Sequence, residues 1–301
     1  MCIRDSIGAV RALYRFVCGW IPVVATHPGH PLAPISEALN AWQIWDQNGH
    51  ARGARPDLGE ILDIGSANTV FSLDRAPDLV LRVRHNMASL SLNSPTQEIT
   101  LWQAAASLSL APDVLWAGTN GDVVITRRLT FDGIDENAHS QLLKSVHESD
   151  IWAPRLSLEK AATRYADAIR KRDLSHLAVD IELPAVREDL QQLDNEPSCF
   201  CHNDLTPTNI GSIGGRYLAI DWEYAALGSR HFDIAVASHH MEEPVRNTFA
   251  EKTAGASFDQ YQWQVACRVV PLMDHLWTLA ALGHTEGVHS KKSLEKRWGI
   301  E

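Results

Sequence analysis

The sequence predicts an α+β protein with two lobes: a small amino-terminal lobe built on an antiparallel sheet and a larger, mainly helical carboxy-terminal lobe. Two observations predict this architecture. Between residues 61 and 126, short apolar runs bounded by turn residues recur at strand length and enclose one helical pattern. Beyond Arg128, apolar residues recur mainly at helical spacing. With 301 residues, 45% of them hydrophobic, the chain is long enough to bury a substantial core.

Residues 1–53 form an uncertain amino-terminal segment with one expected helix. The apolar stretch Val17–Ala25 contains Pro22 and follows Arg11 and Arg15, so it makes a poor secretion signal and is too short to span a bilayer. Apolar residues at helical spacing then predict a helix over Ile35–Asn48.

Residues 54–129 are expected to form the small lobe, in the order strand, strand, strand, helix, strand, strand. Ala111-Pro112 ends the helix, and Asn120-Gly121 is a two-residue hairpin signal between the last two strands. The expected strands are Ile61–Gly65, Val70–Leu73, Leu79–Val83, Val114–Ala117 and Val123–Thr126, and the expected helix is Thr96–Leu108.

Residues 130–301 are expected to form the larger, mainly helical lobe. Within it lies a strand–loop–strand segment, Ser198–Ile210 followed by Arg216–Tyr224, whose polar residues carry most of the functional information. The expected helices are Ala138–Glu148, Glu159–Lys171, Leu183–Leu193, Phe258–Gly283 and Ser293–Trp298.

The charge of the chain limits the kinds of partner it would bind. A formal net charge of -10 argues against nucleic acid and against an anionic membrane surface, because both attract concentrated lysine and arginine. The same charge favours a cationic partner. The oligomeric state stays open.

The cysteines predict a reducing, cytoplasmic setting. Five cysteines, scattered along a chain of this length, do not make a disulfide framework. Cys199 and Cys201 form the single close pair, and the alternating Cys-Phe-Cys-His run favours a buried strand end over a metal clip, because a zinc site normally needs a second ligand pair at suitable spacing.

Three polar residues point to phosphoryl transfer. Asp204 and Asp221 each end an apolar, strand-like run, and Asn209 follows Asp204 by five residues. Phosphoryl transfer needs hard oxygen ligands for Mg²⁺ and a carboxylate that accepts a hydrogen bond from the attacking hydroxyl. One asparagine and two aspartates supply these groups.

The order of these residues resembles a known superfamily. His202-Asn-Asp-Leu-Thr-Pro-Thr-Asn209 resembles the His-x-Asp-x-x-x-x-Asn catalytic loop of the aminoglycoside phosphotransferase and choline kinase superfamily. Ala219-Ile-Asp-Trp-Glu-Tyr-Ala225 resembles the metal-binding segment that replaces Asp-Phe-Gly of protein kinases. Arg230-His-Phe-Asp-Ile-Ala235 resembles the stretch that follows it. The resemblance implies a bilobal, protein-kinase-like fold that binds ATP and Mg²⁺ between its lobes.

The resemblance also implies roles for single residues. Asp204 would be the catalytic base or the carboxylate that orients the acceptor hydroxyl, and His202 would brace the catalytic loop. Asn209 and Asp221 would be the Mg²⁺ ligands. Asp233 would hold the catalytic loop by hydrogen bonds.

In the small lobe the resemblance is looser and implies the nucleotide contacts. Ile64–Phe71 resembles the family's Gly-x-x-Asn loop, in which Gly65, Ser66 and Asn68 would approach the phosphates. Arg82 stands where protein kinases carry the phosphate-binding lysine, and Glu98 would be its ion-pair partner. Residues 126–130, with Arg127, would form the hinge beside the adenine. A plain turn at the loop and surface charges at Arg82 and Glu98 are the alternatives.

The acceptor is expected to be a cationic alcohol. Glu223 and the aromatic residues Trp222, Tyr224 and Trp277 would hold it through carboxylate and cation–π contacts. Choline, ethanolamine and thiamine fit this description. Aminoglycosides are polycations too and form the first alternative. The second alternative is a catalytically silent nucleotide-binding regulatory module, which nucleotide binding without turnover would reveal.

Overall fold

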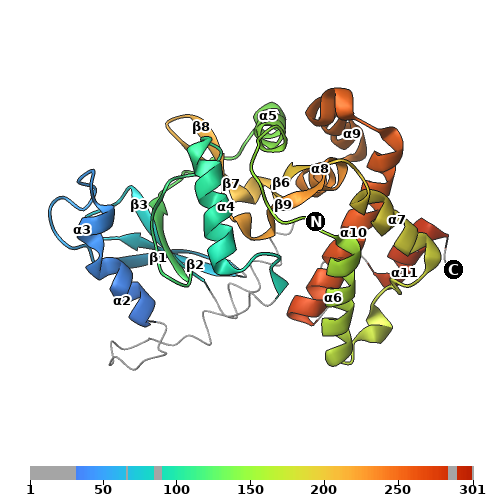
Figure 1. Ribbon diagram of the computed structural model, residues 1–301, viewed down its shortest axis with the longest axis horizontal. Coiled ribbons are helices and arrows are strands. Elements are labelled where there is room, and N and C mark those ends of the chain that lie inside the picture. The colour runs from blue at the N-terminus through green and yellow to red at the C-terminus, as the bar shows by residue number, and fades with distance from the viewer. Residues whose placement is uncertain (1–31, 66, 85–89, 284–289, 300–301) are drawn as a thin grey trace.

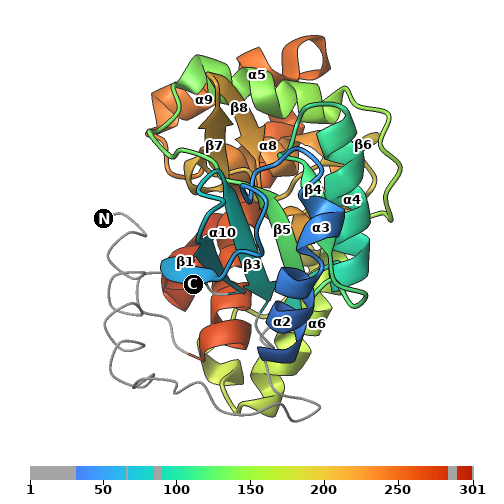
Figure 2. The same cartoon turned by 90° about the vertical axis from the view of Figure 1, so that its left-hand side faces the viewer.

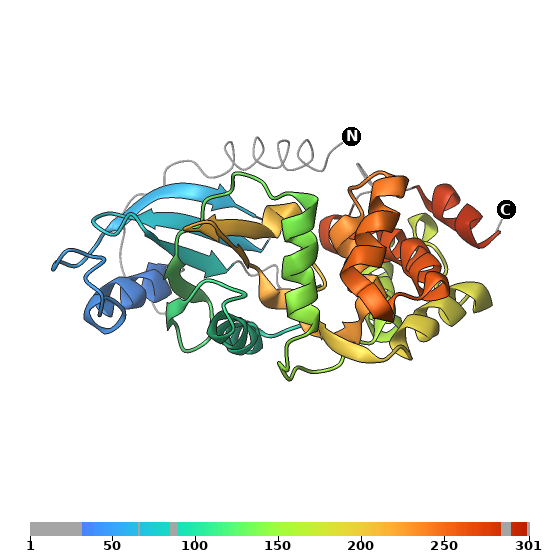
Figure 3. The ribbon, with the colours of Figure 1, turned by 90° about the horizontal axis from the view of Figure 1, so that it is seen from above.

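The computed structural model describes residues 32–65, 67–84, 90–283 and 290–299. These residues form two lobes side by side along the long axis of the molecule, with the sheet in one lobe and most helices in the other (Figure 1). The view from above shows the same separation (Figure 3). The predicted two-lobed α+β architecture is confirmed.

The small lobe contains the five-stranded antiparallel sheet that the sequence predicts. Its strands lie in the order β1-β2-β3-β5-β4, and the sheet faces the viewer in Figure 2. Leu79, Leu81, Val123 and Ile125 project from the central strands into one buried cluster. The strands are β1 Leu58–Ile64, β2 Asn68–Leu73, β3 Leu79–Arg84, β4 Val114–Ala117 and β5 Val123–Arg127.

The helix expected over Ile35–Asn48 is two shorter helices, α2 Leu32–Asn40 and α3 Trp42–Trp45. The backbone leaves helical geometry at Ala41, where ψ is 11°. The break turns the Trp45 side chain back under the sheet, where its indole N–H donates to the carbonyl of Ala38 at 2.8 Å. Packing against the sheet therefore overrides the continuous helical pattern.

Helix α4 Pro95–Ser107 joins the two lobes. Its amino terminus is capped by the Ser94 hydroxyl, which accepts a hydrogen bond from the N–H of Gln97. The buried indole of Trp102 donates to the carbonyl of Pro112 at 2.7 Å and fixes the chain that follows the helix. The hairpin after β4 spans residues 118–122 rather than two residues, with Gly121 at φ 72° against Pro95.

The large lobe is mainly helical, as predicted. Two of its helices, α8 and α9, were missed: α8 is buried along most of its length, and the residues of α9 show little amphipathic period. The helices are α5 Glu136–His147, α6 Leu158–Lys171, α7 Pro184–Asp194, α8 Arg230–Ser238, α9 Glu243–Ala254, α10 Gln260–Leu282 and α11 Lys291–Glu295.

Helix α10 is the core of the large lobe. Within the described residues it is the one helix long and apolar enough to cross a membrane, and 67% of its apolar window is buried inside the protein. It packs against α6, α7 and α8. Its apolar composition is therefore explained by burial in this lobe.

Two short antiparallel pairs lie between the lobes. β6 Ser198–Cys201 pairs with β9 Ala226–Ser229, and β7 Ile210–Ile213 pairs with β8 Arg216–Ala219. The turn between β7 and β8 is Gly214-Gly215, with φ of 57° and 79°, which suits the two-residue hairpin turns that need positive φ. The sequence analysis predicted β6 and β8 and missed their partners.

Candidate active site

The hairpin β7–β8 brings the two predicted metal ligands to one place. Ile210 at the start of β7 pairs with Ala219 at the end of β8. Asn209 immediately precedes the first strand and Asp221 follows the second by two residues. The carbonyl of Asn209 accepts a hydrogen bond from the N–H of Ile220 at 2.9 Å, which extends the ladder toward Asp221. Antiparallel pairing therefore places both side chains at the same end of the hairpin.

The catalytic-loop residues contact one another directly. The amide Nδ2 of Asn209 donates to the carboxylate Oδ2 of Asp204 at 2.8 Å and to its backbone carbonyl at 2.8 Å. Because its nitrogen is engaged with Asp204, Asn209 keeps its carbonyl oxygen for another partner. The loop thus presents one carboxylate and one amide oxygen together.

Asp221 has an unusual backbone conformation that the site explains. Its φ is 68° and its ψ is 65°, a left-handed geometry that aspartate tolerates better than most residues. Its Oδ1 lies 3.7 Å from Nη1 of Arg82 and 3.5 Å from Nδ2 of Asn68. The carboxylate therefore faces two residues predicted to contact the nucleotide.

The acidic side chains of this site repel one another. Burial, together with the charges of Asp221 and Glu223, raises the pKa of Asp204 well above its ordinary value. Burial and the charges of Glu223 and Glu98 raise the pKa of Asp221 to about 7, although Arg82 and Arg84 oppose the shift. A divalent cation placed among these oxygens would relieve the repulsion.

The donor set fits Mg²⁺. Mg²⁺ prefers oxygen ligands and commonly uses one or two carboxylates with substrate phosphates and water. The carboxylate of Asp221 and the free amide oxygen of Asn209 provide such ligands at one end of the hairpin. These two residues would hold the ion.

Asp233 holds the catalytic loop, as the sequence predicts. Its fully buried carboxylate accepts hydrogen bonds from the N–H of His202 at 2.9 Å and from the N–H of Asn203 at 2.7 Å. It also contacts Nε2 of His147, on α5, at 2.9 Å. His147 was missed, because a histidine at the end of a helix gives no sign of a partner 86 residues away.

His202 is the residue expected to brace the loop. Its side chain is fully buried and its Nε2 contacts the carbonyl of Ile220 at 3.0 Å. Burial lowers its pKa to about 4, so the ring is neutral at pH 7. A buried ring that contacts Ile220 agrees with the bracing role that the resemblance implies, and this role stays a prediction.

Arg82 and Glu98 form the expected ion pair. Nη1 of Arg82, on β3, lies 2.6 Å from Oε1 of Glu98, on α4. The guanidinium also lies over the ring of Trp102, 4.9 Å from its centroid. Both charged side chains are almost fully buried, so this is not a surface pair. The role of Arg82 toward phosphate stays a prediction.

A second arginine, Arg84, was missed. It lies two residues after Arg82 on β3 and contacts Oε2 of Glu98, the carboxylate oxygen that does not pair with Arg82. Its Nη2 lies 2.9 Å from Oε2 of Glu223, which the Ser91 hydroxyl also contacts at 2.8 Å. The alternating Leu-Arg-Val-Arg pattern of β3 was the available signal, since strand periodicity puts both arginines on one face.

Two of the predicted substrate contacts, Trp222 and Glu223, are buried in the structure. Trp222 is fully buried and stacks against Phe200, with ring centroids 5.9 Å apart, so it belongs to the core and forms no wall for a substrate. Glu223 is 6% exposed and is committed to Arg84 and Ser91. Residues adjacent to a metal ligand were assumed to face the cleft, whereas the short helical turn Trp222–Tyr224 directs these two inward.

The two other predicted substrate residues lie together. The indole N–H of Trp277, on α10, donates to the hydroxyl of Tyr224 at 2.9 Å, and both residues are partly exposed. Burial, followed by the charge of Glu223, raises the pKa of Tyr224 above its ordinary value. A contact of this aromatic pair with a substrate stays a prediction.

The predicted nucleotide loop is described in part. Ser66 lies outside the described residues. The N–H of Gly65 donates to the carbonyl of Asn68 at 2.8 Å, and Asn68 is buried and reaches Asp221. Among the described residues, a side chain at Gly65 would meet the Asn68 carbonyl at 3.6 Å, an ordinary contact.

The predicted hinge follows β5. Arg127 ends this strand, and Thr130 pairs with Ser212 on β7 through backbone hydrogen bonds of 3.0 and 2.8 Å. Gly211 allows this approach, because a Cβ there would lie 2.7 Å from the Cβ of Leu129. The chain between the lobes is thus held against the hairpin that carries the metal ligands. Nucleotide binding by Arg127 stays a prediction.

Comparison with solved structures identifies the fold. A choline/ethanolamine kinase family protein from Mesorhizobium loti has a TM-score of 0.57 at 18% identity, over 88% of this chain and 92% of that one. Choline kinase LicA from Streptococcus pneumoniae has a TM-score of 0.58 at 13% identity, over 86% and 96%. APH(2")-IIia, in complex with GDP and kanamycin, has 0.55 at 13% identity, over 86% and 96%. The protein therefore has the bilobal, kinase-like fold.

Comparison of sequences identifies the family. A Protein LicA homolog of Mycoplasma capricolum subsp. capricolum is 24% identical over 122 residues, which are 40% of this chain and 50% of that protein. The chain thus spans about half the length of this curated relative. Residues 60–266, more than half of the chain, match the model of the phosphotransferase enzyme family. The predicted site residues Asp204, Asn209 and Asp221 lie within the matched region. This protein belongs to the phosphotransferase enzyme family.

Proposed function

We propose that this protein transfers the γ-phosphoryl group of ATP to a hydroxyl of a cationic small molecule, in the presence of Mg²⁺. The observation that carries the proposal is the hairpin β7–β8, which brings Asn209 and Asp221 to the same end. Asn209 also donates a hydrogen bond to the carboxylate of Asp204. A base and two metal ligands in one cluster match the requirements of phosphoryl transfer.

The protein groups would act mainly by positioning and by charge. The carboxylate of Asp204 would accept a hydrogen bond from the acceptor hydroxyl and orient its oxygen for in-line attack. Arg82, held by Glu98, would neutralise phosphate charge with its guanidinium. A bound Mg²⁺ would offset the charge that develops on the transferred phosphoryl group.

Three observations support a cationic alcohol as the acceptor. The aromatic pair Tyr224 and Trp277 is partly exposed, and aromatic ring faces attract quaternary and primary ammonium groups. The chain carries a formal net charge of -10. The fold is shared with choline kinases. Choline, ethanolamine and thiamine are the proposed candidates, and a cytoplasmic location would supply the ATP.

The test is a substrate panel. Purified protein with ATP and Mg²⁺ is offered choline, ethanolamine, thiamine and kanamycin, and the phosphorylated product is identified by mass spectrometry. We expect one of the three alcohols to be phosphorylated. Phosphorylation of kanamycin alone would favour an aminoglycoside phosphotransferase, and nucleotide binding without any product would favour a silent module.

A pair of tryptophan variants tests the acceptor site. Trp277→Ala should raise KM for the accepted alcohol by about 5- to 30-fold, the loss of roughly 1–2 kcal/mol of cation–π attraction. Trp222→Phe, a change in the buried core, is the matched control and should leave KM for the alcohol within about twofold. Equal effects of the two variants would contradict the assignment of Trp277 as a substrate contact.

A further inference from the structure

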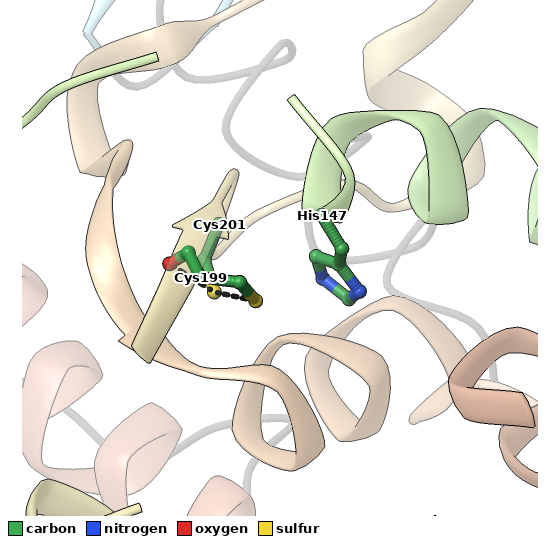
Figure 4. Close-up of side chains that lie close together, drawn as sticks. All are labelled: His147, Cys199 and Cys201. Carbon is green, nitrogen blue, oxygen red and sulfur yellow. Dashed lines mark hydrogen bonds between the residues drawn. The ribbon is translucent and has the colours of Figure 1, made fainter. Parts of the chain in front are cut away.

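A cluster of metal-ligating side chains lies behind the catalytic loop, outside the candidate active site. It consists of His147 at the end of α5 and of Cys199 and Cys201 on β6. One ligand atom of each residue lies within 4.8 Å of the others. Figure 4 shows the imidazole ring and the two thiols on facing elements, with a gap between them that is bounded by the three side chains.

The strand explains why the two thiols lie together. Residues two apart in a strand project to the same face, so Cys199 and Cys201 both point from β6 toward α5. Their sulfurs are 3.7 Å apart. This is far beyond a disulfide bond of about 2.05 Å, so the two residues are free thiols.

The distance between the two sulfurs suits binding to one metal ion. A Zn²⁺ ion binds thiolates at about 2.3 Å in a tetrahedral arrangement, which sets neighbouring sulfurs about 3.8 Å apart. The observed distance of 3.7 Å equals this edge within the precision of the comparison. The two sulfurs therefore need no rearrangement to bind one ion.

The imidazole of His147 is oriented in the way that metal-binding histidines are. Its Nε2 contacts the carboxylate of Asp233 at 2.9 Å. Its Nδ1 is buried and has no hydrogen-bond partner among the described residues. A histidine whose one nitrogen contacts a carboxylate, with the other nitrogen left to bind a cation, is the common arrangement around protein-bound metals. A buried nitrogen without a partner otherwise costs stability.

The cluster can be reached from one side. Cys199 is partly exposed, whereas Cys201 and His147 are buried. An ion can therefore enter from the side of Cys199, where a water molecule or an external thiol can complete the coordination.

We propose that His147, Cys199 and Cys201 bind one thiophilic cation of the Zn²⁺ class, with Asp233 as the carboxylate that orients the histidine. Thiolate and imidazole ligands select such ions over Mg²⁺ and Ca²⁺, which prefer oxygen. The site is distinct from the Mg²⁺ ligands Asn209 and Asp221. The sequence contains no second pair of ligands at suitable spacing for zinc. In the structure, His147 from a distant helix supplies the third ligand instead.

The site is coupled to the catalytic loop through one carboxylate. Asp233 contacts His147 and also accepts the hydrogen bonds from the N–H groups of His202 and Asn203. A cation on His147 fixes the ring that contacts Asp233, and so supports the start of the loop that carries Asp204. Occupancy should therefore raise the unfolding temperature of the protein.

The test is metal binding by the full chain, held reduced with a phosphine. Wild-type protein is dialysed against Zn²⁺ and the bound metal is counted, and Cd²⁺ is titrated in parallel while the cadmium–thiolate absorption in the ultraviolet is followed. The Cys199→Ser variant removes one ligand at a partly exposed position. The Cys267→Ser variant, which alters a free cysteine on α10, is the matched control.

We expect the wild type and Cys267→Ser to bind one equivalent of Zn²⁺ more than Cys199→Ser does. The affinity of that equivalent should fall at least about 100-fold in Cys199→Ser, because loss of even an outer partner costs 10- to 100-fold. An unchanged stoichiometry and affinity in Cys199→Ser, or no thiolate absorption with Cd²⁺ in the wild type, would overturn the proposal. A further measurement needs no variant: in the wild type, bound Zn²⁺ should slow the reaction of Cys199 with an alkylating reagent. An unchanged rate of alkylation would also contradict the proposal.

Discussion

Arg84 joins three segments of the chain through single side-chain contacts. Its guanidinium contacts Glu98 on α4 and Glu223 near Asp221, the proposed metal ligand, and its side chain is 2% exposed. Two buried carboxylates thus depend on Arg84, while Glu98 also has Arg82. Removing the arginine leaves a buried carboxylate without its counter-charge. This lowers the free energy of unfolding by far more than a surface ion pair contributes to it.

The first prediction concerns the stability that Arg84 provides. Arg84→Met should lower the free energy of unfolding by about 3–5 kcal/mol, because Glu223 loses its cationic partner in a buried site. Arg55→Met is the control, since Arg55 forms an exposed pair with Asp57 and should change stability by at most about 1 kcal/mol. Urea unfolding followed by circular dichroism measures both. Similar losses for the two variants would refute the buried network.

At the scale of elements, the hairpin β7–β8 determines the geometry of the site. The motif residues Asp204, Asn209 and Asp221 were predicted to share one site, but the hairpin that brings Asn209 and Asp221 together was not, because β7 was not recognised. Gly214-Gly215 between two short apolar runs was a usable signal for this hairpin. By contrast, the five strands of the small lobe were predictable, since each has turn residues at its ends and β-branched residues within it.

The second prediction concerns the contact between this hairpin and the chain that joins the lobes. Gly211→Ala places a Cβ 2.7 Å from the Cβ of Leu129, so the linker must shift, and overpacking of this kind costs about 1–3 kcal/mol. If this linker, residues 126–130, contacts the adenine, KM for ATP should rise by about 5-fold or more, while KM for the acceptor changes little.

The control for this prediction is Gly228→Ala on β9. A Cβ at Gly228 would meet Leu156 at 3.7 Å, an ordinary contact, so both KM values and stability should stay close to those of the wild type. Steady-state kinetics with each substrate varied in turn, together with urea unfolding, distinguish the two positions. A normal KM for ATP in Gly211→Ala would contradict a role of residues 126–130 in nucleotide binding.

At the scale of the whole molecule, several buried groups make stability depend on pH with opposite signs. Burial lowers the pKa values of His139 and His202 to about 4 from an ordinary value of 6.5. The unfolded chain therefore binds more protons between these values, and the histidines cause stability to fall as pH drops from about 6.5 to 4. The raised pKa values of Asp204 and Asp221 act in the opposite direction.

The third prediction isolates one of these groups. His139 is 1% exposed, and its Nε2 contacts the carbonyl of Leu205 at 2.7 Å, which a glutamine amide can also reach. His139→Gln removes a titrating group, so the difference in unfolding free energy between wild type and variant should shift by about 2 kcal/mol in favour of the variant between pH 7.5 and pH 5. Urea unfolding at both pH values measures the shift. A constant difference would contradict a neutral, buried His139.

Long-range side-chain placement was the main feature that the sequence did not reveal. Trp222 and Glu223 adjoin Asp221 and look like site residues in the sequence, yet one packs in the core and the other pairs with an arginine from the opposite lobe. His147 and Asp233 meet across 86 positions. Local patterns report strand and helix periodicity and short motifs, whereas these contacts depend on how segments far apart in the sequence pack together.

The central claim, that Asp204 is the catalytic carboxylate of a Mg²⁺-dependent phosphotransferase, is tested most directly by Asp204→Asn. The side chain keeps its size and can still accept from Nδ2 of Asn209, so folding and ATP binding should persist. With the acceptor identified by the panel, kcat should fall by about 10²- to 10⁴-fold, the usual contribution of a positioned base. A variant that binds ATP and turns over at the wild-type rate would contradict the assignment of Asp204.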